Sequence, residues 1–291
     1  MARFSSRIWL LGAAAMPLLG AAVLSALSLH ADEASTVTGK STRSGNALLV
    51  DRVATERLLV GTDDGAFESL DGGRSWRRSG LDGREVVALA RLKDGTVWAG
   101  GHGFLARSSD GGRSWIDVRP PGLPSLDVRA LSASRDVSGR LEAAIGGEGL
   151  FRSNDGGQTF GKLDLYSPVG SEARALVETI DGVIFVSDEG RGVVVNGDGD
   201  GADWIDVLGQ SPSALAPNYG DPHHALLLAS TDEGVLRTTD KGETWVEVLP
   251  LESGGGPVAF SQSRMELAYA LAGDGITYRS TDFGATWTAV G

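Results

Sequence analysis

The chain has 291 residues, of which 41% are hydrophobic and 42 are glycine. This hydrophobic content supports a packed core and excludes wholesale disorder, while glycine stands well above its usual share of about 7%. The absence of cysteine excludes a disulfide framework, a cysteine-ligated zinc site and a thiol nucleophile. A net charge of −12 argues against nucleic acid or anionic lipid as the main partner.

The N-terminus reads as an export segment over residues 1–31. Arg3 and Arg7 precede an uncharged apolar run from Ile8 to Leu29, which is the pattern of a signal peptide. The run exceeds the usual apolar region of about 7–15 residues, so it is also long enough to span a bilayer as an anchor. We therefore expect an exported protein, periplasmic or extracellular, either cleaved near Ala31 or tethered to the inner membrane by residues 8–29. Residues 32–45 are small and polar and are predicted to be a linker.

The rest of the chain repeats itself. Six segments align: SLDGGRSW (69–76), SSDGGRSW (108–115), SNDGGQTF (153–160), NGDGDGADW (196–204), TTDKGETW (238–245) and STDFGATW (280–287). Their aspartates follow one another at spacings of 39, 45, 43, 42 and 42 residues. Five of the seven tryptophans close a repeat, and a phenylalanine takes the sixth place. A period near 42 is typical of the four-stranded blade of a β-propeller.

Each repeat reads as four strands. In the second repeat, strands are predicted at 85–92, 96–100, 104–109 and 114–118, with Asp-Gly and Gly-Gly turns between them. The same pattern places blades at 46–79, 84–118, 127–163, 173–207, 213–248 and 257–290. The fold class is therefore predicted as all-β, a six-bladed β-propeller over 46–291, behind the apolar export or anchor helix. Seven blades is the alternative, if residues 33–45 contribute strands.

The segments resemble the Asp-box, or bacterial neuraminidase, repeat, and the resemblance covers about 46–290. It implies a hairpin turn that joins the third and fourth strands of a blade. The aspartate accepts hydrogen bonds from its own turn, and the aromatic residue packs against the neighbouring blade. The residues expected in this structural role are Asp71, Trp76, Asp110, Trp115, Asp155, Phe160, Asp198, Trp204, Asp240, Trp245, Asp282 and Trp287.

The opposite face of such a propeller carries the hairpins between the second and third strands. One side chain recurs just before a glycine of these hairpins: Asp64, His102, Glu148, Glu189, Glu233 and Asp274. A propeller would place them once per blade on one face, where they could form a binding rim of negative potential. The competing interpretation is plain turn chemistry, because acid–glycine pairs suit tight hairpins.

Two arginines occupy equivalent positions at the start of the first strands of blades three and four, near the axis. Arg129 and Arg174 are predicted either to pair with Glu148 and Glu189 or to hold a carboxylate, such as a peptide C-terminus, in bidentate fashion.

Catalytic residues are not expected. Sialidases share the repeat, but their arginine triad, with one member in an Arg-Ile-Pro segment, has no counterpart before Asp71, and Tyr269 and Tyr278 lack a glutamate partner. A glycosidase needs two carboxylates across a cleft, and no inserted loop marks out such a pair. The alternative of an exported glycan-binding or glycoside-hydrolase-like protein stays open.

The fourth box departs from the others because it carries an extra residue. A calcium loop built from Asn196, Asp198, Asp200 and Asp203 is a weak candidate, since position twelve is Val207 and not glutamate. A degenerate box with an insertion is the favoured interpretation. We expect no metal and no cofactor, including at the adjacent His223 and His224.

The compact blades, the Ser-x-Asp-Gly-Gly-x-Ser-Trp boxes and the exported N-terminus are similar to those of the photosystem II assembly and stability factors and their bacterial relatives. The lipid-bearing cysteine of some of these proteins is absent. The resemblance implies a monomeric, non-catalytic propeller that binds a protein partner in the envelope and helps to assemble or stabilise a membrane complex. It implies no nucleic acid and membrane contact only through the N-terminal segment.

Overall fold

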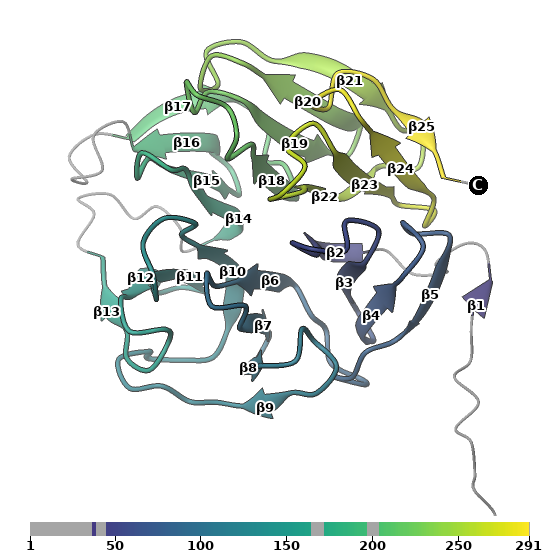
Figure 1. Ribbon diagram of the computed structural model, residues 1–291. Helices are drawn as coiled ribbons and strands as arrows, with labels where there is room; N and C mark the ends of the chain where they lie inside the picture. The colour runs from purple at the N-terminus through teal and green to yellow at the C-terminus, as the bar shows by residue number, and fades with distance from the viewer. Residues whose placement is uncertain (1–36, 39–44, 164–171, 197–203, 291) are drawn as a thin grey trace, which may run out of the picture. The chain divides into compact units, whose positions relative to one another are not determined.

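Six antiparallel sheets surround a common axis in the computed structural model (Figure 1). The structure describes residues 37–38, 45–163, 172–196 and 204–290, which belong to one unit, Ala34–Gly291. The predicted leader at 1–31 and most of the predicted linker lie outside the described residues. Within the described part, no helix has the length and hydropathy needed to cross a membrane.

Each sheet is a blade of four consecutive strands, ordered from the axis outward. Blade 1 holds β2 (Gly45–Val50), β3 (Leu58–Thr62), β4 (Gly65–Ser69) and β5 (Ser75–Arg78). Blade 2 holds β6 (Ala88–Arg91), β7 (Val97–Gly101), β8 (Phe104–Ser108) and β9 (Ile116–Asp117). Blade 3 holds β10 (Val128–Ala133), β11 (Leu141–Ile145), β12 (Gly149–Ser153) and β13 (Gly161–Lys162).

The second half of the unit continues the pattern. Blade 4 holds β14 (Ala173–Glu178), β15 (Ile184–Asp188), β16 (Gly192–Asn196) and β17 (Trp204–Leu208). Blade 5 holds β18 (Ala214–Pro217), β19 (Leu227–Thr231), β20 (Gly234–Thr238) and β21 (Val246–Pro250). Blade 6 holds β22 (Gly255–Phe260), β23 (Ala268–Ala272), β24 (Thr277–Ser280) and β25 (Thr288–Ala289).

The described residues form six blades, which confirms the six-bladed prediction over the seven-bladed alternative. A short strand, β1 (Val37–Thr38), comes from the segment that the alternative required. It pairs with β5, Val37 opposite Trp76, and so adds a fifth, outermost strand to blade 1.

The second strand of every blade is buried at all five positions, as in β7 and β15. These strands are covered on both faces by neighbouring blades, so they read as continuous apolar runs rather than alternating ones. The outermost strands β9, β13 and β25 are two residues long and exposed. The first strand of blade 2 begins at Ala88, three residues later than predicted; just before it, the Val86 amide donates to the Thr62 carbonyl of blade 1 at 2.9 Å.

The box turns share one hydrogen-bond network in the five blades where the turn is described. In the third box, the Ser153 hydroxyl donates to Asp155 Oδ1 at 2.7 Å and accepts from the Gly157 amide at 2.8 Å. The Thr159 amide and hydroxyl donate to Asp155 Oδ1 and Oδ2 at 2.9 and 2.6 Å. Equivalent bonds centre on Asp71, Asp110, Asp240 and Asp282. The box is therefore a self-contained turn; Asp198 of the fourth box lies outside the described residues.

These hydrogen bonds stabilise the fold while the box aspartate is ionised, so their contribution to stability is lost in acid. The Thr159 hydroxyl and amide, together with Ser153, lower the pKa of Asp155 from 3.8 to about 2. A depressed carboxyl pKa contributes stability above the unfolded value of about 3.9, and this contribution is lost as the pH falls toward 2.

We expect Asp155→Asn to lower the melting temperature at neutral pH, and the difference from wild type to shrink on acidification from about pH 4 to about pH 2, where the wild-type carboxyl is itself protonated. Thermal unfolding followed by circular dichroism measures it. Glu252→Gln, at an exposed carboxylate between β21 and β22, is the control. A difference that stays constant over this range would contradict the assignment.

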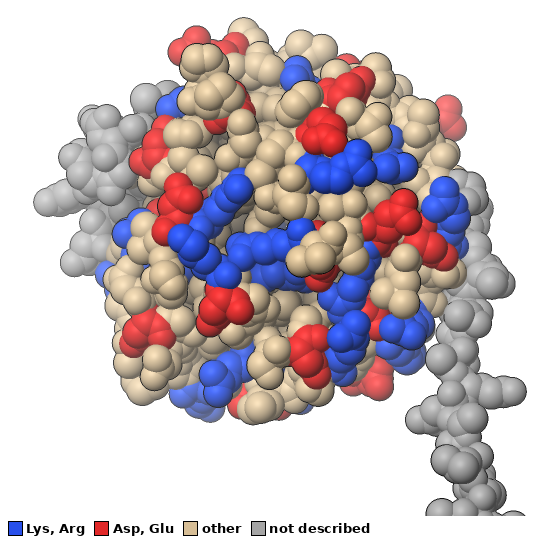
Figure 2. Space-filling view, in the orientation of Figure 1, with Lys and Arg blue, Asp and Glu red and all other residues tan. Residues whose placement is uncertain are grey.

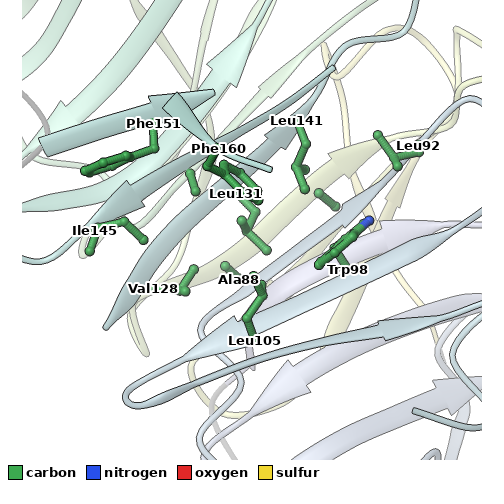
Figure 3. Packing of buried hydrophobic residues seen from close by; sticks show 12 residues of the cluster. Ala88, Leu92, Trp98, Leu105, Val128, Leu131, Leu141, Ile145, Phe151 and Phe160 are labelled. Atoms are coloured by element: carbon green, nitrogen blue, oxygen red, sulfur yellow. The ribbon is translucent and has the colours of Figure 1, made fainter. Parts of the chain in front are cut away.

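In the five boxes whose closing side chain is described, the aromatic residue packs against the preceding blade. Trp115 Nε1 donates to the Ser79 carbonyl of blade 1 at 2.8 Å, and Trp245 Nε1 donates to the Val207 carbonyl of blade 4 at 3.1 Å. Phe160 and Trp98 of blade 2 belong to one buried cluster between blades 2 and 3 (Figure 3). The side chain of Trp204 is not among those that the structure describes.

The same contact closes the ring of blades. Trp76 of blade 1 packs with Leu267 and Tyr269 of blade 6 in one buried cluster. The Thr277 hydroxyl of blade 6 also donates to the Gly73 carbonyl at 3.2 Å. Among the described residues, blades 1 and 6 are thus joined by side-chain packing, with each blade built from its own consecutive strands.

Candidate functional site: the axial channel

The two faces of the propeller differ in what they carry. The second-to-third-strand hairpins and the starts of the innermost strands share one end of the axis, as the pairing of Gly45 with Thr62 shows. We call this end the hairpin face. The box turns and the loops between first and second strands lie at the other end, the box face. The channel along the axis can therefore present a different site at each end.

A ring of aliphatic side chains divides the channel. The innermost strands place one at an equivalent position in each blade: Leu48, Leu89, Leu131, Leu176, Leu215 and Val258. All six are buried. They line two cavities, one on the box-face side of the ring and a smaller one on its hairpin-face side. We call them the aliphatic ring. Polar groups on its two sides belong to separate compartments.

The hairpin-face cavity has a volume of about 400 Å³. Its charged and imidazole-bearing lining residues are Arg129, Arg174, His102, Glu85 and Asp232. Asn46 and Ser213 add an amide and a hydroxyl. This cavity is polar, and it brings together both arginines and the histidine singled out in the sequence.

The other predicted rim residues lie elsewhere on the hairpins. Glu148, Glu189, Glu233 and Asp274 are exposed in their hairpins and do not line the cavity. Asp64 forms an ion pair with Arg78 at 2.7 Å. Asp274 Oδ1 accepts the Ile276 amide at 3.1 Å, a bond of turn chemistry. Of the six predicted rim residues, only His102, in blade 2, lines this cavity; the hairpin between β19 and β20 contributes Asp232 instead of the predicted Glu233.

Arg129 is held by an aspartate of its own blade. Its Nε and Nη2 lie 3.2 and 3.1 Å from Asp127 Oδ2, and His102 Nδ1 lies 2.6 Å from Asp127 Oδ1. Burial raises the pKa of Asp127, but the hydrogen bonds from His102 and Arg129 outweigh it and lower that pKa overall. The predicted pairing of Arg129 with Glu148 is therefore wrong: the carboxylate two residues earlier on the same chain is nearer.

Arg174 has no hydrogen-bond or ion-pair partner in the part of the chain that the structure describes. It is exposed and lines both the hairpin-face cavity and the small cavity above the aliphatic ring. The predicted pair with Glu189 does not form, because Glu189 stays in its hairpin. A guanidinium without a carboxylate partner, beside the cavity that Arg129 also lines, is a ready site for an anionic group.

The sequence interpretation missed three acidic residues of this site. Glu85, Asp127 and Asp232 lie in the segments that lead into the innermost strands or directly beside a predicted rim residue. Asp127 also bridges to His102 through the backbone. Glu85 and Asp127 could have been found by their position just before an inner strand, and Asp232 by its position next to Glu233 in the repeated hairpin.

Metal candidates from the sequence find no support in the described residues. Asp198, Asp200 and Asp203 lie outside them, and Asn196 is a buried strand residue of β16. His224 Nδ1 lies 3.8 Å from Asp181 Oδ2. No group of three or more metal-ligating side chains occurs where the structure is described.

Basic side chains gather toward the axis although the whole chain is acidic. Figure 2 shows one face, on which Lys and Arg cover much of the middle while Asp and Glu are interspersed around them.

Comparisons with known proteins agree on the fold. No family model matches the chain. It is 33% identical over 113 residues to the photosystem II assembly lipoprotein Ycf48 of Synechococcus sp. (strain CC9902), covering 35% of this chain and 32% of that protein. It is 28% identical over 217 residues to a xyloglucanase of Paenibacillus sp, covering 67% of this chain and 20% of that enzyme. The chain thus spans a third or less of either relative.

Solved structures give the same two groups. Ycf48 bound to D1 peptide matches with a TM-score of 0.53 at 18% identity, over 87% of this chain and 83% of that one. The GH74 xyloglucanase from Xanthomonas campestris matches with a TM-score of 0.59 at 18% identity, over 88% and 46%. A gluconolactonase from the same organism has a TM-score of 0.66 at 12% identity, over 82% and 86%. At these identities the likeness shows the propeller fold.

Proposed function

We propose that this chain is an exported, non-catalytic propeller that binds a carboxylate-bearing segment of a partner protein in its hairpin-face cavity, and so helps to assemble or stabilise an envelope complex. The observation that carries the proposal is Arg174, a guanidinium without a described partner, at the mouth of a cavity of about 400 Å³ that Arg129 also lines. The export itself is proposed from residues 1–31.

The chemistry of the cavity suits a peptide carboxylate. A guanidinium binds a carboxylate through two parallel hydrogen bonds, which fix orientation as well as charge. Asn46 and Ser213 in the same lining can bond the peptide groups that precede it. The resemblance to Ycf48, one structure of which holds a D1 peptide, supports a protein as the partner class.

The test is binding of partner proteins and of peptides with a free C-terminus. We expect wild-type protein to capture a defined partner from envelope extracts, and Arg174→Ala to weaken binding of that partner's carboxyl-terminal peptide by about tenfold or more. Amidation of the peptide should have the same effect. Arg113→Ala, at an exposed arginine in the second box turn on the other face, is the control.

Two results would overturn this proposal. One is identical prey for wild type and the Arg129→Ala/Arg174→Ala double variant. The other is equal affinity for free and amidated peptides in calorimetric titration.

A glycan ligand is the second candidate. Glu85 and Asp232 line the same cavity, and the matched xyloglucanases share the fold. Under this alternative, the protein would cleave or bind members of a panel of chromogenic glycosides and xyloglucan oligosaccharides. Turnover that disappears in Glu85→Gln or Asp232→Asn would replace the protein-binding proposal.

A further inference from the structure

The box-face end of the channel holds a second basic cluster. Arg52, Arg91 and Arg135 come from blades 1, 2 and 3, each at or just after the end of the innermost strand. Arg91 lines the box-face cavity of about 130 Å³ together with Tyr219, Gln262 and the aliphatic ring. The ring separates this cavity from the hairpin-face site.

Arg91 is the central member of the cluster. Its side chain is 6% exposed, and Nη1 lies 3.0 Å from Asp51 Oδ2. Its Nε and Nη2 atoms are buried and have no hydrogen-bond partner. These two nitrogens form one edge of the guanidinium, the fork that binds an oxyanion through two parallel hydrogen bonds. Leaving both donors buried and unbonded is unfavourable, so an oxyanion that reached this edge would gain two hydrogen bonds.

The neighbouring arginines add charge that the protein does not neutralise in full. Arg52 Nε donates to Gln262 Oε1 at 2.6 Å and Nη1 to the Lys93 carbonyl at 3.0 Å, which are neutral acceptors. Burial lowers the pKa of Arg52, and repulsion from Arg91 and Arg135 lowers it further. Arg91 and Arg135 are therefore close enough to Arg52 to disfavour its positive charge.

The acidic groups that act on this cavity are Asp51 and the buried pair Glu142 and Glu178, whose charges reach Tyr219. Arg152 and Arg140 pair with one oxygen of Glu142 and of Glu178.

Asp51 Oδ2 is shared between Arg91 and Arg57, at 3.0 and 3.1 Å, and Asp51 Oδ1 accepts two backbone amides. Asp94 stabilises the positive charge of Arg52 by electrostatic attraction. Arg135 lies over the Tyr219 ring at 5.9 Å, a cation–π contact that leaves its charge in place.

We propose that the box-face cavity binds a small oxyanion of the phosphate or sulfate class on the Nε–Nη2 edge of Arg91, with Arg52 and Arg135 supplying further positive charge. A cavity of about 130 Å³ has room for an ion of this size, since one water occupies about 30 Å³ of liquid. The site is independent of the partner-binding site proposed on the hairpin face.

The experiment is calorimetric titration of the full chain with sodium phosphate and with sodium sulfate at low salt, against sodium chloride at matched ionic strength. We expect saturable binding of phosphate or sulfate, a higher melting temperature in its presence, and no such effect of chloride. Arg91→Lys keeps the charge but removes the fork, so affinity should fall by about tenfold.

Further variants separate the site from general charge effects. Arg135→Gln leaves the Asp51–Arg91 pair intact and should weaken binding several-fold, while Arg113→Ala should not alter it. Phenyl phosphate distinguishes two kinds of ligand. If it binds, the cavity admits a phosphate monoester at the end of a larger ligand. If only inorganic phosphate binds, the site takes the free ion. The proposal is overturned by chloride acting equally well, by unchanged affinity in both Arg91→Lys and Arg135→Gln, or by binding that Arg174→Ala abolishes instead.

Discussion

Replacing Gly157 by alanine is expected to destabilise the protein by about 3 kcal/mol, whereas the same change at the neighbouring Gly156 should cost only about 1 kcal/mol. Both glycines lie in the third box turn with positive φ, 86° at Gly157 and 77° at Gly156. In both variants an alanine side chain must therefore adopt a left-handed backbone conformation, which is unfavourable. A Cβ at Gly157 would also overlap the ring of Trp98, while one at Gly156 would meet only Leu92 Cδ1, at 4.0 Å.

Trp98 cannot move aside to make room. It is 1% exposed and packs among Leu131, Leu141 and Phe160 between blades 2 and 3 (Figure 3). The Gly157 amide is tied to the Ser153 hydroxyl at 2.8 Å, so the turn is fixed as well. Overpacking of such a core costs about 1–3 kcal/mol beyond the backbone strain.

Urea unfolding of wild type, Gly156→Ala and Gly157→Ala, followed by tryptophan fluorescence, gives the two free-energy differences. Because the backbone penalty is common to both variants, their difference isolates the contact between box turn and neighbouring blade. Equal losses of stability in the two variants would show that the turn does not press on Trp98.

Replacing Glu142 by glutamine is expected to leave stability nearly unchanged in mild acid and to raise it by several kcal/mol above pH 8. Burial, and then repulsion from Glu178, raises the pKa of Glu142 from 4.5 to about 8, against the opposing effect of Arg152. Glu142 and Glu178 are each 1% exposed, and the Oε2 atom of each has no hydrogen-bond partner. Arg152 Nε donates to Glu142 Oε1 at 2.9 Å, and Arg140 Nη1 lies 2.8 Å from Glu178 Oε1.

The sign follows from proton linkage. A carboxyl whose folded pKa is raised binds its proton more tightly in the native state, so its contribution is fully present below the unfolded value of about 4.3 and is lost as the pH rises to about 8. Each unit of pKa shift corresponds to about 1.4 kcal/mol. Glutamine resembles the protonated acid at every pH, and therefore removes the loss.

Melting temperatures of wild type and Glu142→Gln from about pH 5 to about pH 9 test this. Glu68→Gln is the matched control. Glu68 is also buried, but its two oxygens accept from Arg57 and Arg77 at 2.9 and 2.6 Å, so losing its charge should lower the melting temperature at both ends of the range. Parallel pH profiles for wild type and Glu142→Gln would show that Glu142 is ionised throughout.

The box turns were predictable because their physics is local. The hydroxyl, carboxylate and amides that form the third turn all lie between Ser153 and Thr159, so a short segment of sequence contains the whole network. Repetition at a period near 42 residues then predicted six blades, and an aromatic residue at the end of the box predicted the contact between them.

The candidate site was predictable only in part. His102, Arg129 and Arg174 do line one cavity, because equivalent positions in successive blades must lie around one axis. Their partners were not predictable: Arg129 pairs with Asp127 rather than Glu148, and none of the five predicted acidic hairpin residues lines the cavity. Such pairings depend on how far each strand lies from the axis and on side-chain reach, which the repeat does not encode.

The sequence by itself determined the number of blades, the strands within them and the turns that close them, since these depend on hydrogen bonds and apolar patterns within about forty residues. The tertiary structure alone decided which charges meet at the axis: Arg174 without a described partner on one side of the aliphatic ring, and Arg91 with an unbonded guanidinium edge on the other. Residues in different blades are distant in the chain and come together only when the ring of blades closes, so their electrostatic balance is a property of the assembled propeller.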